Sequence, residues 1–441
     1  MKSLFFALLL CQSAFCIASP TILPEREQAA LQDKILHQRF TQLLQPLMQR
    51  ENIDLWLLIS REYNEDPVLK TMLPATWLSA RRRTMLVIYN PGAGKPLQLH
   101  AVARYDVGDL FKKAWDVEQQ PDQWQALREL IQSKNPQRIG INQSEFFGHA
   151  DGMVATELTT LQQKLGAELN TKLVSAEKLA VGWLETRAAL ELQHYPQLTK
   201  IGHQLIQRAF SNEVITPGKT TTEDVVWWLR QQSTFLGLPV WFHPTVSIQR
   251  ASSEKFDQIK AFSAAKTDNL ILPGDLLHVD FGLTYLRLNS DQQQHAYVLR
   301  PGETKAPDYL IEALLKGNRA QDILTSNFKT GRSGNSLLQL SLQQAKAEGL
   351  AATIYSHPLG HHGHGAGPTI GMWDAQQGVV GSGDYPLTAD TAYSIELNVA
   401  VDIPQWGNSI RIMLEEDGYF DGQQFHYFSG RQTELHLISS P

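Results

Sequence analysis

Acidic residues lie within or directly before four strand-like segments in the second half of this 441-residue chain. Asp280 lies within 276–282, Asp291 directly precedes 292–299, Glu396 lies within 392–398, and Glu415 lies within 409–418. An ionised carboxylate is costly to bury unless a counter-charge or hydrogen-bond donors accompany it. We therefore expect the fold to bring these strands to a common partner for their acids.

The first two acids are close in the sequence. The segment between the strands that carry Asp280 and Asp291 is short, so we expect the strands to pair as an antiparallel hairpin. Two carboxylates held close together repel each other unless they share a proton or a cation. The alternative is that Asp280 caps a turn and Asp291 lies on the surface.

A histidine-rich stretch follows at 357–367, where His357, His361, His362 and His364 lie among glycines. Neutral imidazole is the commonest metal-binding side chain, and glycine lets backbone approach a ligand closely. The stretch therefore predicts a metal or catalytic site. The alternative is a solvent-exposed loop.

Side-chain alternation helps to choose between neighbouring acids near the C-terminus. In a strand over 409–418, Arg411, Met413 and Glu415 share one face, and Glu416 points to the other. Two Asp, two Glu and one His can bridge two divalent cations. Hard oxygen ligands suit Mn²⁺ first, with Co²⁺, Fe²⁺ or Zn²⁺ as alternatives. Two such cations support metal-assisted hydrolysis without a Ser or Cys nucleophile.

The N-terminus has the pattern of a secretory signal peptide over residues 1–18, with a basic start, an apolar run and small residues near Ala18. Both cysteines lie inside this segment, so the mature chain would have no disulfide and no thiol site. We therefore predict a periplasmic or secreted protein. A buried N-terminal helix is the alternative, and a lipoprotein signal is less well supported.

Composition excludes other classes of protein. The chain has 39 Lys+Arg against 45 Asp+Glu, a net charge of −6, so we predict no nucleic-acid partner. No later apolar run has the roughly 18 residues that a membrane span needs, so we predict no membrane contact after signal removal.

The chain divides near residue 185. Residues 19–184 alternate strands with helices, which predicts a smaller N-terminal α/β domain, and 185–441 has two helices followed by a run of strands and glycine-rich turns, which predicts an α+β domain. We expect helices over 24–50, 124–133, 185–212 and 221–236, and strands over 53–59, 84–89, 97–104 and 138–142.

The order Asp, Asp, His, Glu, Glu resembles the pita-bread metallopeptidases, which include methionine aminopeptidase, Xaa-Pro aminopeptidase, prolidase and the metal-free creatinase. Gly274 to Gly282 is similar to their "GD-L-h-x-D-x-G" strand, Ser290-Asp291 to their second Asp, and Gly363 to Gly367 to their "GHGxG" loop. Glu396 matches their first Glu, and 411–417 resembles their final "R-x-x-E-D" strand. The resemblance covers about 185–440. It implies a pita-bread (creatinase/aminopeptidase-like) C-terminal domain, and the N-terminal half looks like the extra domain of the Xaa-Pro aminopeptidase, prolidase and creatinase branch.

The resemblance also implies roles for single residues. Glu415 would double as general base, His357 or His361 would stabilise the oxyanion, and His243 and Arg411 would bind substrate. The implied metal ligands are Asp280, Asp291, His364, Glu396 and Glu415.

The chain departs from the family pattern at several positions. Met413 stands where the family usually has its last Glu, so Glu415 assumes an insertion and Glu416 is the alternative. His361 is the alternative to His364. A further family histidine is replaced by Phe262-Ser263, and His243, His361 or His357 could substitute for it.

From these features we predict a dinuclear-metal peptidase of the Xaa-Pro aminopeptidase or dipeptidase type. The alternatives are a non-catalytic peptide or small-molecule binding protein on the same fold, and a metal-independent, creatinase-like amide hydrolase. A homodimer would be consistent with the resemblance.

Overall fold

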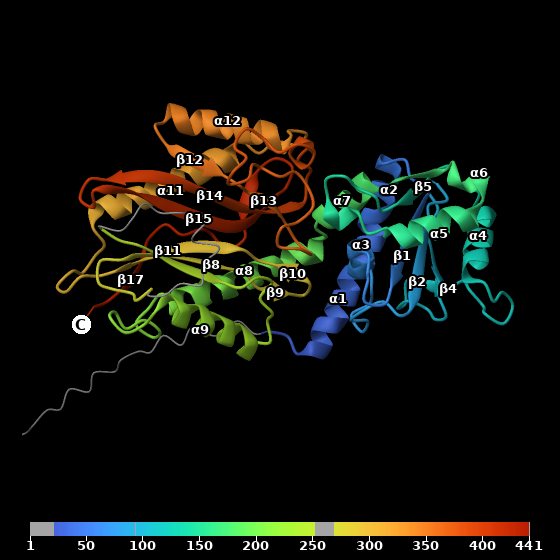
Figure 1. Ribbon diagram of the computed structural model, residues 1–441, viewed down its shortest axis with the longest axis horizontal. Helices are drawn as coiled ribbons and strands as arrows, with labels where there is room; N and C mark the ends of the chain where they lie inside the picture. The colour runs from blue at the N-terminus through green and yellow to red at the C-terminus, as the bar shows by residue number, and fades with distance from the viewer. Residues whose placement is uncertain (1–21, 93, 252–268, 441) are drawn as a thin grey trace, which may run out of the picture.

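The computed structural model describes residues 22–92, 94–251 and 269–440, and the predicted signal peptide (1–18) lies outside these residues. Two lobes lie side by side, each built on a sheet (Figure 1). The N-terminal lobe has a six-stranded sheet, and the C-terminal lobe has a nine-stranded one.

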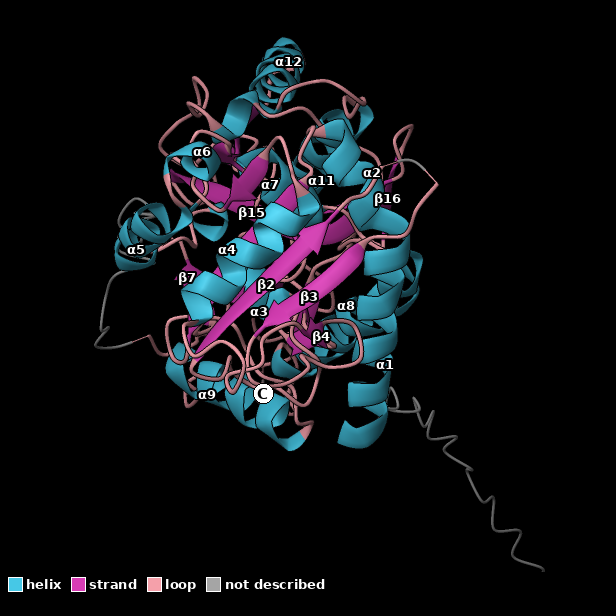
Figure 2. Ribbon diagram, turned by 90° about the vertical axis from the view of Figure 1, so that its right-hand side faces the viewer, coloured by secondary structure: helices cyan, strands magenta, loops and turns pink. Residues whose placement is uncertain are grey.

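The N-terminal sheet is mixed and has the order β4-β3-β2-β1-β5-β6. β1 pairs antiparallel with β2 and parallel with β5, so it lies at the centre of the sheet. Figure 2 looks at the molecule from this end, with β2 and β3 side by side. The strands are β1 (Leu55–Arg61), β2 (Arg83–Tyr89), β3 (Gln98–Val102), β4 (Lys112–Lys113), β5 (Ile139–Ile141) and β6 (Leu173–Ser175).

Helices cover both faces of this sheet. Trp56 and Leu58 of β1 belong to the core formed with α1, α2 and α7, whereas Leu57 and Ile59 belong to the core formed with α4 and α5. Successive strand residues point to opposite faces, so β1 is apolar on both faces from Leu55 to Ile59. The helices are α1 (Glu25–Arg39), a π-helical turn (Phe40–Leu44), α2 (Gln45–Arg50), α3 (Pro67–Thr71), α4 (Gln123–Lys134), a 3₁₀ turn (Gly148–Ala150), α5 (Ala155–Leu165), α6 (Ala167–Asn170) and α7 (Glu177–Glu185).

The C-terminal sheet has the order β12-β14-β15-β11-β8-β7, and the short strands β13, β16 and β17 pair with β14, β15 and β11. β9 and β10 form a small hairpin between β8 and β11. The strands are β7 (Thr245–Gln249), β8 (Leu276–Phe281), β9 (Thr284–Tyr285), β10 (Leu288–Asn289), β11 (Gln292–Val298), β12 (Ala351–Ile354), β13 (His357–Leu359), β14 (Thr391–Ile403), β15 (Asn408–Phe420), β16 (Phe425–Tyr427) and β17 (His436–Ile438).

Two helix pairs pack on the same face of this sheet and leave the other face for the acids. Leu277 and Val279 pack with α8 and α9, and Ile412 and Leu414 pack with α11 and α12. A Cβ on Gly317 of α11 would lie only 2.7 Å from Ile412 Cγ2, so close packing needs glycine there. The helices are α8 (Ala189–Ala209), α9 (Thr222–Phe235), α11 (Asp308–Ser326), α12 (Gly334–Ala347) and a 3₁₀ turn (Ser382–Asp384).

The sequence-based elements are largely present, with shifted ends. The helix expected over 24–50 contains a π-helical turn, Phe40–Leu44, between α1 and α2. The helix expected over 185–212 is shorter, because α8 is Ala189–Ala209. α9 begins after Thr221, whose hydroxyl accepts a hydrogen bond from Asp224 N at 3.2 Å. Such a cap satisfies a backbone donor that the helix leaves free.

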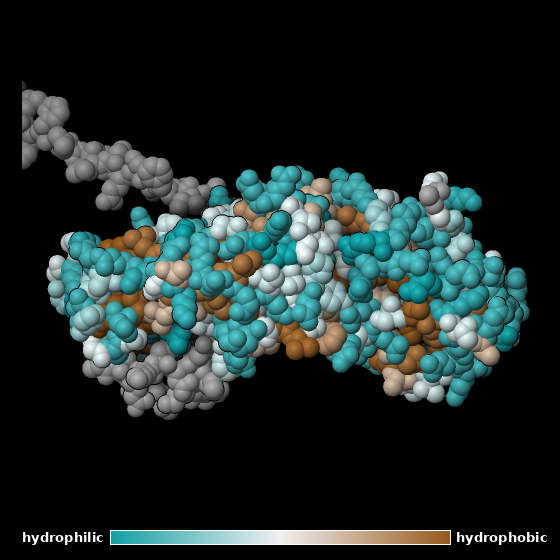
Figure 3. Space-filling model, turned by 90° about the horizontal axis from the view of Figure 1, so that it is seen from above, coloured by the Kyte–Doolittle hydropathy of each residue, from teal (hydrophilic) through white to brown (hydrophobic). Residues whose placement is uncertain are grey.

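The surface is polar over most of the face seen in Figure 3, with hydrophobic residues in separate patches. No helix among residues 22–92, 94–251 and 269–440 is long and apolar enough to cross a membrane.

Candidate metal centre

Three of the acids lie on neighbouring strands of the C-terminal sheet. Glu396 of β14 is directly opposite Glu415 of β15. Gln293 of β11 is opposite both Glu415 and Asp280 of β8. The register therefore lines up the three carboxylates on the face that the helix pairs leave open.

Asp291 joins this row from the turn that precedes β11. β8 and β11 pair antiparallel, with Gln292 opposite Phe281, so the predicted hairpin is confirmed. Oxygen atoms of Asp280, Asp291 and Glu415 lie within 4.8 Å of one another. The alternative of a surface Asp291 is wrong, since this residue is 3 % exposed.

His357 lies at the start of β13 and points into the acid cluster. Its Nε2 atom is 3.4 Å from Glu415 Oε1 and 3.9 Å from both Asp291 Oδ2 and Glu396 Oε2. Its other ring nitrogen, Nδ1, is 3.0 Å from Pro358 O. A proton on Nδ1 would satisfy that carbonyl and leave Nε2 with a lone pair facing the carboxylates.

Few side chains donate hydrogen bonds to the acid cluster. Gln293 Nε2 donates to Glu396 Oε1 at 2.5 Å and Glu415 Oε2 at 2.7 Å, and Ser394 Oγ donates to Glu415 Oε1 at 2.7 Å. Asp280 Oδ1, Asp291 Oδ1 and His357 Nε2 are buried without a hydrogen-bond partner among the described residues. Converging, unsatisfied oxygen and imidazole atoms are the ligands of divalent cations, so this donor set fits one or more such ions.

Electrostatics support the same interpretation. Burial raises the pKa of Asp280, Asp291 and Glu396 well above their ordinary values, and repulsion from Glu415 adds to each shift. Carboxylates in such a cluster are stable as anions only beside positive charge. Divalent cations would supply that charge.

His364, the predicted metal ligand, lies at the outer edge of the cluster. Its side chain is exposed, and its ring lies 4.7 Å from that of His357 and 5.3 Å from that of Trp241, between centroids. Partial burial of the ring against its neighbours and the charge of His357 lower its pKa to about 4. Ligand atoms of Asp291, His357 and His364 lie within 4.8 Å of one another, so His364 can still reach a cation that those two residues bind.

His361 and His243 lie elsewhere. His361 Nε2 is 3.6 Å from Glu191 Oε1 on α8, and burial lowers the pKa of this histidine well below its ordinary value. The exposed ring of His243 instead contacts Trp227, at 5.5 Å between centroids, and its Nδ1 is 3.3 Å from Arg230 Nη1. The structure therefore does not bring His243 to the acid cluster, because its ring packs beside α9. Phe262-Ser263 lie outside the described residues.

The alternation predicted for β15 is confirmed. Glu416 points to the opposite face, where its Oε2 is 2.5 Å from His203 Nε2 and its Oε1 accepts from Gln294 Nε2 at 2.8 Å. Glu416 is therefore wrong as an alternative to Glu415. Arg411 shares the face of Glu415, and its Nη1 donates to Asn398 Oδ1 at 2.7 Å.

Sequence reasoning missed three residues around the cluster. Gln293 and Ser394 donate to its glutamates, and the Oδ2 atom of Asp417 accepts a hydrogen bond from the backbone of Asp291 at 3.0 Å. Alternation along the strand could have found Ser394 and Asp417, which lie two residues from Glu396 and Glu415. Gln293 also lies two residues from Asp291, so the same alternation could have found it.

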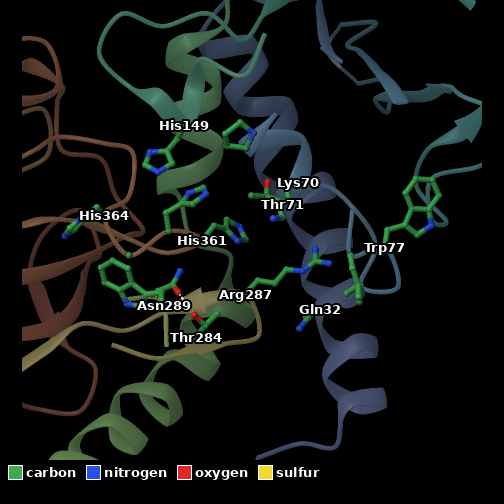
Figure 4. Close-up of a pocket in the computed structure, with 16 residues that line it drawn as sticks. Gln32, Lys70, Thr71, Trp77, His149, Thr284, Arg287, Asn289, His361 and His364 are labelled. Carbon is green, nitrogen blue, oxygen red and sulfur yellow. Dashed lines mark hydrogen bonds between the residues drawn. The ribbon is translucent and has the colours of Figure 1, made fainter. Parts of the chain in front are cut away.

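A cavity of about 800 Å³ adjoins the cluster and lies between the two lobes (Figure 4). His364 and Trp241 belong to its wall, so it reaches the acid cluster through His364 and His357. Trp241 Nε1 also donates to Ser290 O at 2.8 Å, next to Asp291. A peptide could approach the acids through this cavity.

Comparison with known protein families agrees with this site. The model of metallopeptidase family M24 matches residues 195–415, half of the chain. The chain belongs to metallopeptidase family M24. The matched range contains all the acids of the cluster and His357, so this M24 protein is a metallopeptidase, and its acid cluster is the candidate binding site for the divalent metals of the family.

Solved structures share the fold of this M24 chain. An X-Pro aminopeptidase from Thermotoga maritima is 14% identical, with a TM-score of 0.62 over 89% of this chain and 100% of that one. A Xaa-Pro dipeptidase from Bacillus anthracis is 15% identical, with a TM-score of 0.58 over 94% of this chain and 100% of that one. A prolidase from Pyrococcus horikoshii is 14% identical, with a TM-score of 0.56 over 91% of this chain and 99% of that one. The pita-bread fold is thereby established. A comparison with curated proteins found no match to this chain.

Proposed function

We propose that this M24 protein is a dinuclear-metal peptidase of the Xaa-Pro type, acting as an aminopeptidase or a dipeptidase. The observation that carries the proposal is the convergence of four carboxylates and His357 on one face of the sheet, with buried ligand atoms that have no other described partner. The X-Pro and Xaa-Pro enzymes among the structural neighbours support the substrate type.

Five residues would hold the two metals. Asp280, Asp291 and Glu415 form one group of ligand atoms, and His357, Glu396 and Glu415 form another. Glu415 belongs to both groups and would bridge the ions. This proposal replaces His364 by His357 as the histidine ligand, because His357 Nε2 faces three carboxylates from within the cluster.

When bound, divalent cations would lower the pKa of a water molecule and polarise the peptide carbonyl. Glu415, or Glu396, would accept the proton of the attacking water as general base. His364 is largely neutral above its pKa of about 4, so an N–H of its ring can donate to the oxyanion as the carbonyl is attacked. His361 lies in the cavity wall and would contact the substrate rather than the oxyanion.

Three further parts of the proposal come from the sequence. Mn²⁺ is the preferred metal, with Co²⁺, Fe²⁺ or Zn²⁺ as alternatives. The signal sequence over 1–18 would export the protein to the periplasm or medium. Peptides would be the substrate partners, and a homodimer is consistent with the family resemblance.

Metal analysis with a peptidase assay tests the proposal. Untagged mature protein is equilibrated with Mn²⁺ and desalted, its metal content is measured by mass spectrometry, and hydrolysis of Ala-Pro and longer Xaa-Pro peptides is followed. We expect about two metals per chain and hydrolysis that a chelator abolishes. Metal-independent hydrolysis would favour the creatinase-like alternative, and absence of both metal and hydrolysis would favour the binding protein.

A further inference from the structure

The wall of the cavity beside the acid cluster carries positive charge. Its sixteen lining residues contain no Asp or Glu, and Lys70 and Arg287 give it positive charge. The lining comes from both lobes, with Lys70 at the end of α3 and Arg287 in the turn between β9 and β10 (Figure 4). Such a wall attracts anions and repels an ammonium group.

The ammonium charge of Lys70 has no partner among the described residues. This lysine lies in the last turn of α3, its side chain is exposed, and its ammonium group makes no hydrogen bond or ion pair with residues in the described part of the chain. Its charge lowers the pKa of His362 in the same wall, after the larger effect of burial. Lys70 is therefore free to bind an anion that enters the cavity.

Arg287, by contrast, is held in place. Its backbone has a positive φ of 66°, and its Nη1 and Nη2 donate to Leu73 O at 2.7 Å and Pro74 O at 3.2 Å. These bonds use neutral acceptors, so the guanidinium keeps its charge. Burial lowers the pKa of Arg287, and the charge of Asp33, which lies outside the cavity wall, acts against this effect and raises it. Asp33 Oδ1 itself accepts a hydrogen bond from Ala75 N at 2.7 Å.

The cavity adjoins the acid cluster, where the proposed peptidase would cleave its substrate. His364 links it to the cluster, and Asn289 of the wall lies two residues before Asp291. Cavities of roughly 300–1,000 Å³ enclose small ligands, and this one has about 800 Å³, so it can take only a short portion of a peptide.

We propose that this cavity binds the free C-terminal carboxylate of a short peptide, with Lys70 as its direct partner and Arg287 as a fixed second charge. The proposal rests on the proposed peptidase function and narrows its substrates to dipeptides and similarly short peptides. The N-terminal ammonium of the substrate would then lie on the other side of the cleaved bond, away from Lys70 and Arg287.

The test compares Ala-Pro with its C-terminal amide, Ala-Pro-NH₂, in the Mn²⁺-loaded protein. The wild type should hydrolyse the free acid with kcat/KM at least about 10-fold above that of the amide, since a charge-assisted contact is lost in the amide. Lys70→Met should raise KM for the free acid by about 10-fold or more, with little change for the amide. Loss of binding that is equal in ground and transition states raises KM and leaves kcat unchanged.

Matched variants make this result specific. Lys346→Met removes an exposed lysine from the last turn of α12 and should change neither substrate's KM. Lys70→Arg keeps the charge and should retain most of the preference for the free acid. Unchanged melting temperature and metal content in all three variants exclude a folding or metal defect.

The possible failures are distinct. Equal hydrolysis of acid and amide by the wild type, or an acid preference that survives Lys70→Met, would overturn the carboxylate site and leave the peptidase function standing. Equally efficient cleavage of long Xaa-Pro peptides would also contradict it, because their carboxylate lies beyond the cavity. No hydrolysis of any peptide by metal-loaded protein would overturn the proposed function, and this inference with it.

Discussion

Glu396 and Glu415 lie directly opposite each other on β14 and β15, and the Nε2 atom of Gln293 donates to both, at 2.5 Å and 2.7 Å. Opposite residues of an antiparallel pair have Cβ atoms only roughly 4.5–5.5 Å apart, and like charges there destabilise the sheet. The arrangement therefore indicates a functional requirement, which a bound cation would satisfy.

Replacing Glu415 by Gln tests this requirement. Glu415→Gln should lower metal content and reduce kcat for Xaa-Pro hydrolysis by at least about 100-fold, since it removes both a ligand and a general base. Metal analysis and steady-state kinetics measure the two effects.

Glu416→Gln is the matched control, one residue along the same strand. Glu416 faces the opposite side of the sheet and contacts His203, so this variant should keep its metals and most of its activity. Equal metal loss in the two variants would contradict the face assignment of Glu415.

His357 and His364 should differ in the same analysis. His357→Ala should lose metal. Its metal affinity should fall by more than the roughly 10- to 100-fold loss that is typical when a residue that hydrogen-bonds to a metal ligand is replaced. His364→Ala should keep its metals and lose kcat, because His364 is the exposed member of the group that it forms with Asp291 and His357 and is absent from both groups that contain Glu415. The reverse pattern would restore His364 as the ligand.

The local sequence pattern was enough to predict which acids lie close together and which face of its strand each one occupies. The short segment between two strands predicts that Asp280 and Asp291 meet, and the period of two places Glu415 and Glu416 on opposite faces. Both predictions depend only on neighbours in sequence or on one strand, and the structure agrees with both.

The histidines could not be chosen in this way. His357 faces the acids because the three-residue strand β13 pairs with β14, placing His357 opposite Ser394. That pairing is non-local, and the glycine pattern that favoured His364 does not reveal it. The position of His243 could not be predicted for a similar reason. β7 pairs with β8, but His243 lies before β7 begins, and its ring packs on Trp227.

The stability of the protein should fall as the pH rises toward 7, through Glu185 at the end of α7. Burial raises the pKa of this carboxyl group to about 7 from an ordinary 4.5, and its Oε2 has no hydrogen-bond partner among the described residues. Between these values the folded state binds a proton that the unfolded state has lost, so Glu185 lowers the free energy of unfolding by up to about 1.4 kcal/mol per pH unit.

Glu185→Gln should remove this contribution. The variant keeps the amide oxygen as an acceptor for Thr388 Oγ1, which lies 3.1 Å from Glu185 Oε1. Relative to wild type it should gain stability above pH 7 and show little gain at pH 4.5. Urea unfolding at both pH values measures this difference, and a pH-independent difference would contradict the assignment.

The junction between the lobes depends on one buried carboxylate. Glu191 of α8 is 0 % exposed and binds Arg39 Nη1 of α1 at 2.6 Å and Arg187 Nη1 at 3.2 Å. Removing one partner leaves the others as uncompensated buried charges, so Glu191→Gln should lower the free energy of unfolding by about 3–5 kcal/mol. Glu348→Gln breaks a surface pair with Arg319, at 2.7 Å, and should have little effect. Denaturant unfolding measures both variants. Equal effects would show that Arg39 and Arg187 find other compensation, in which case packing rather than charge would hold α1 against α8.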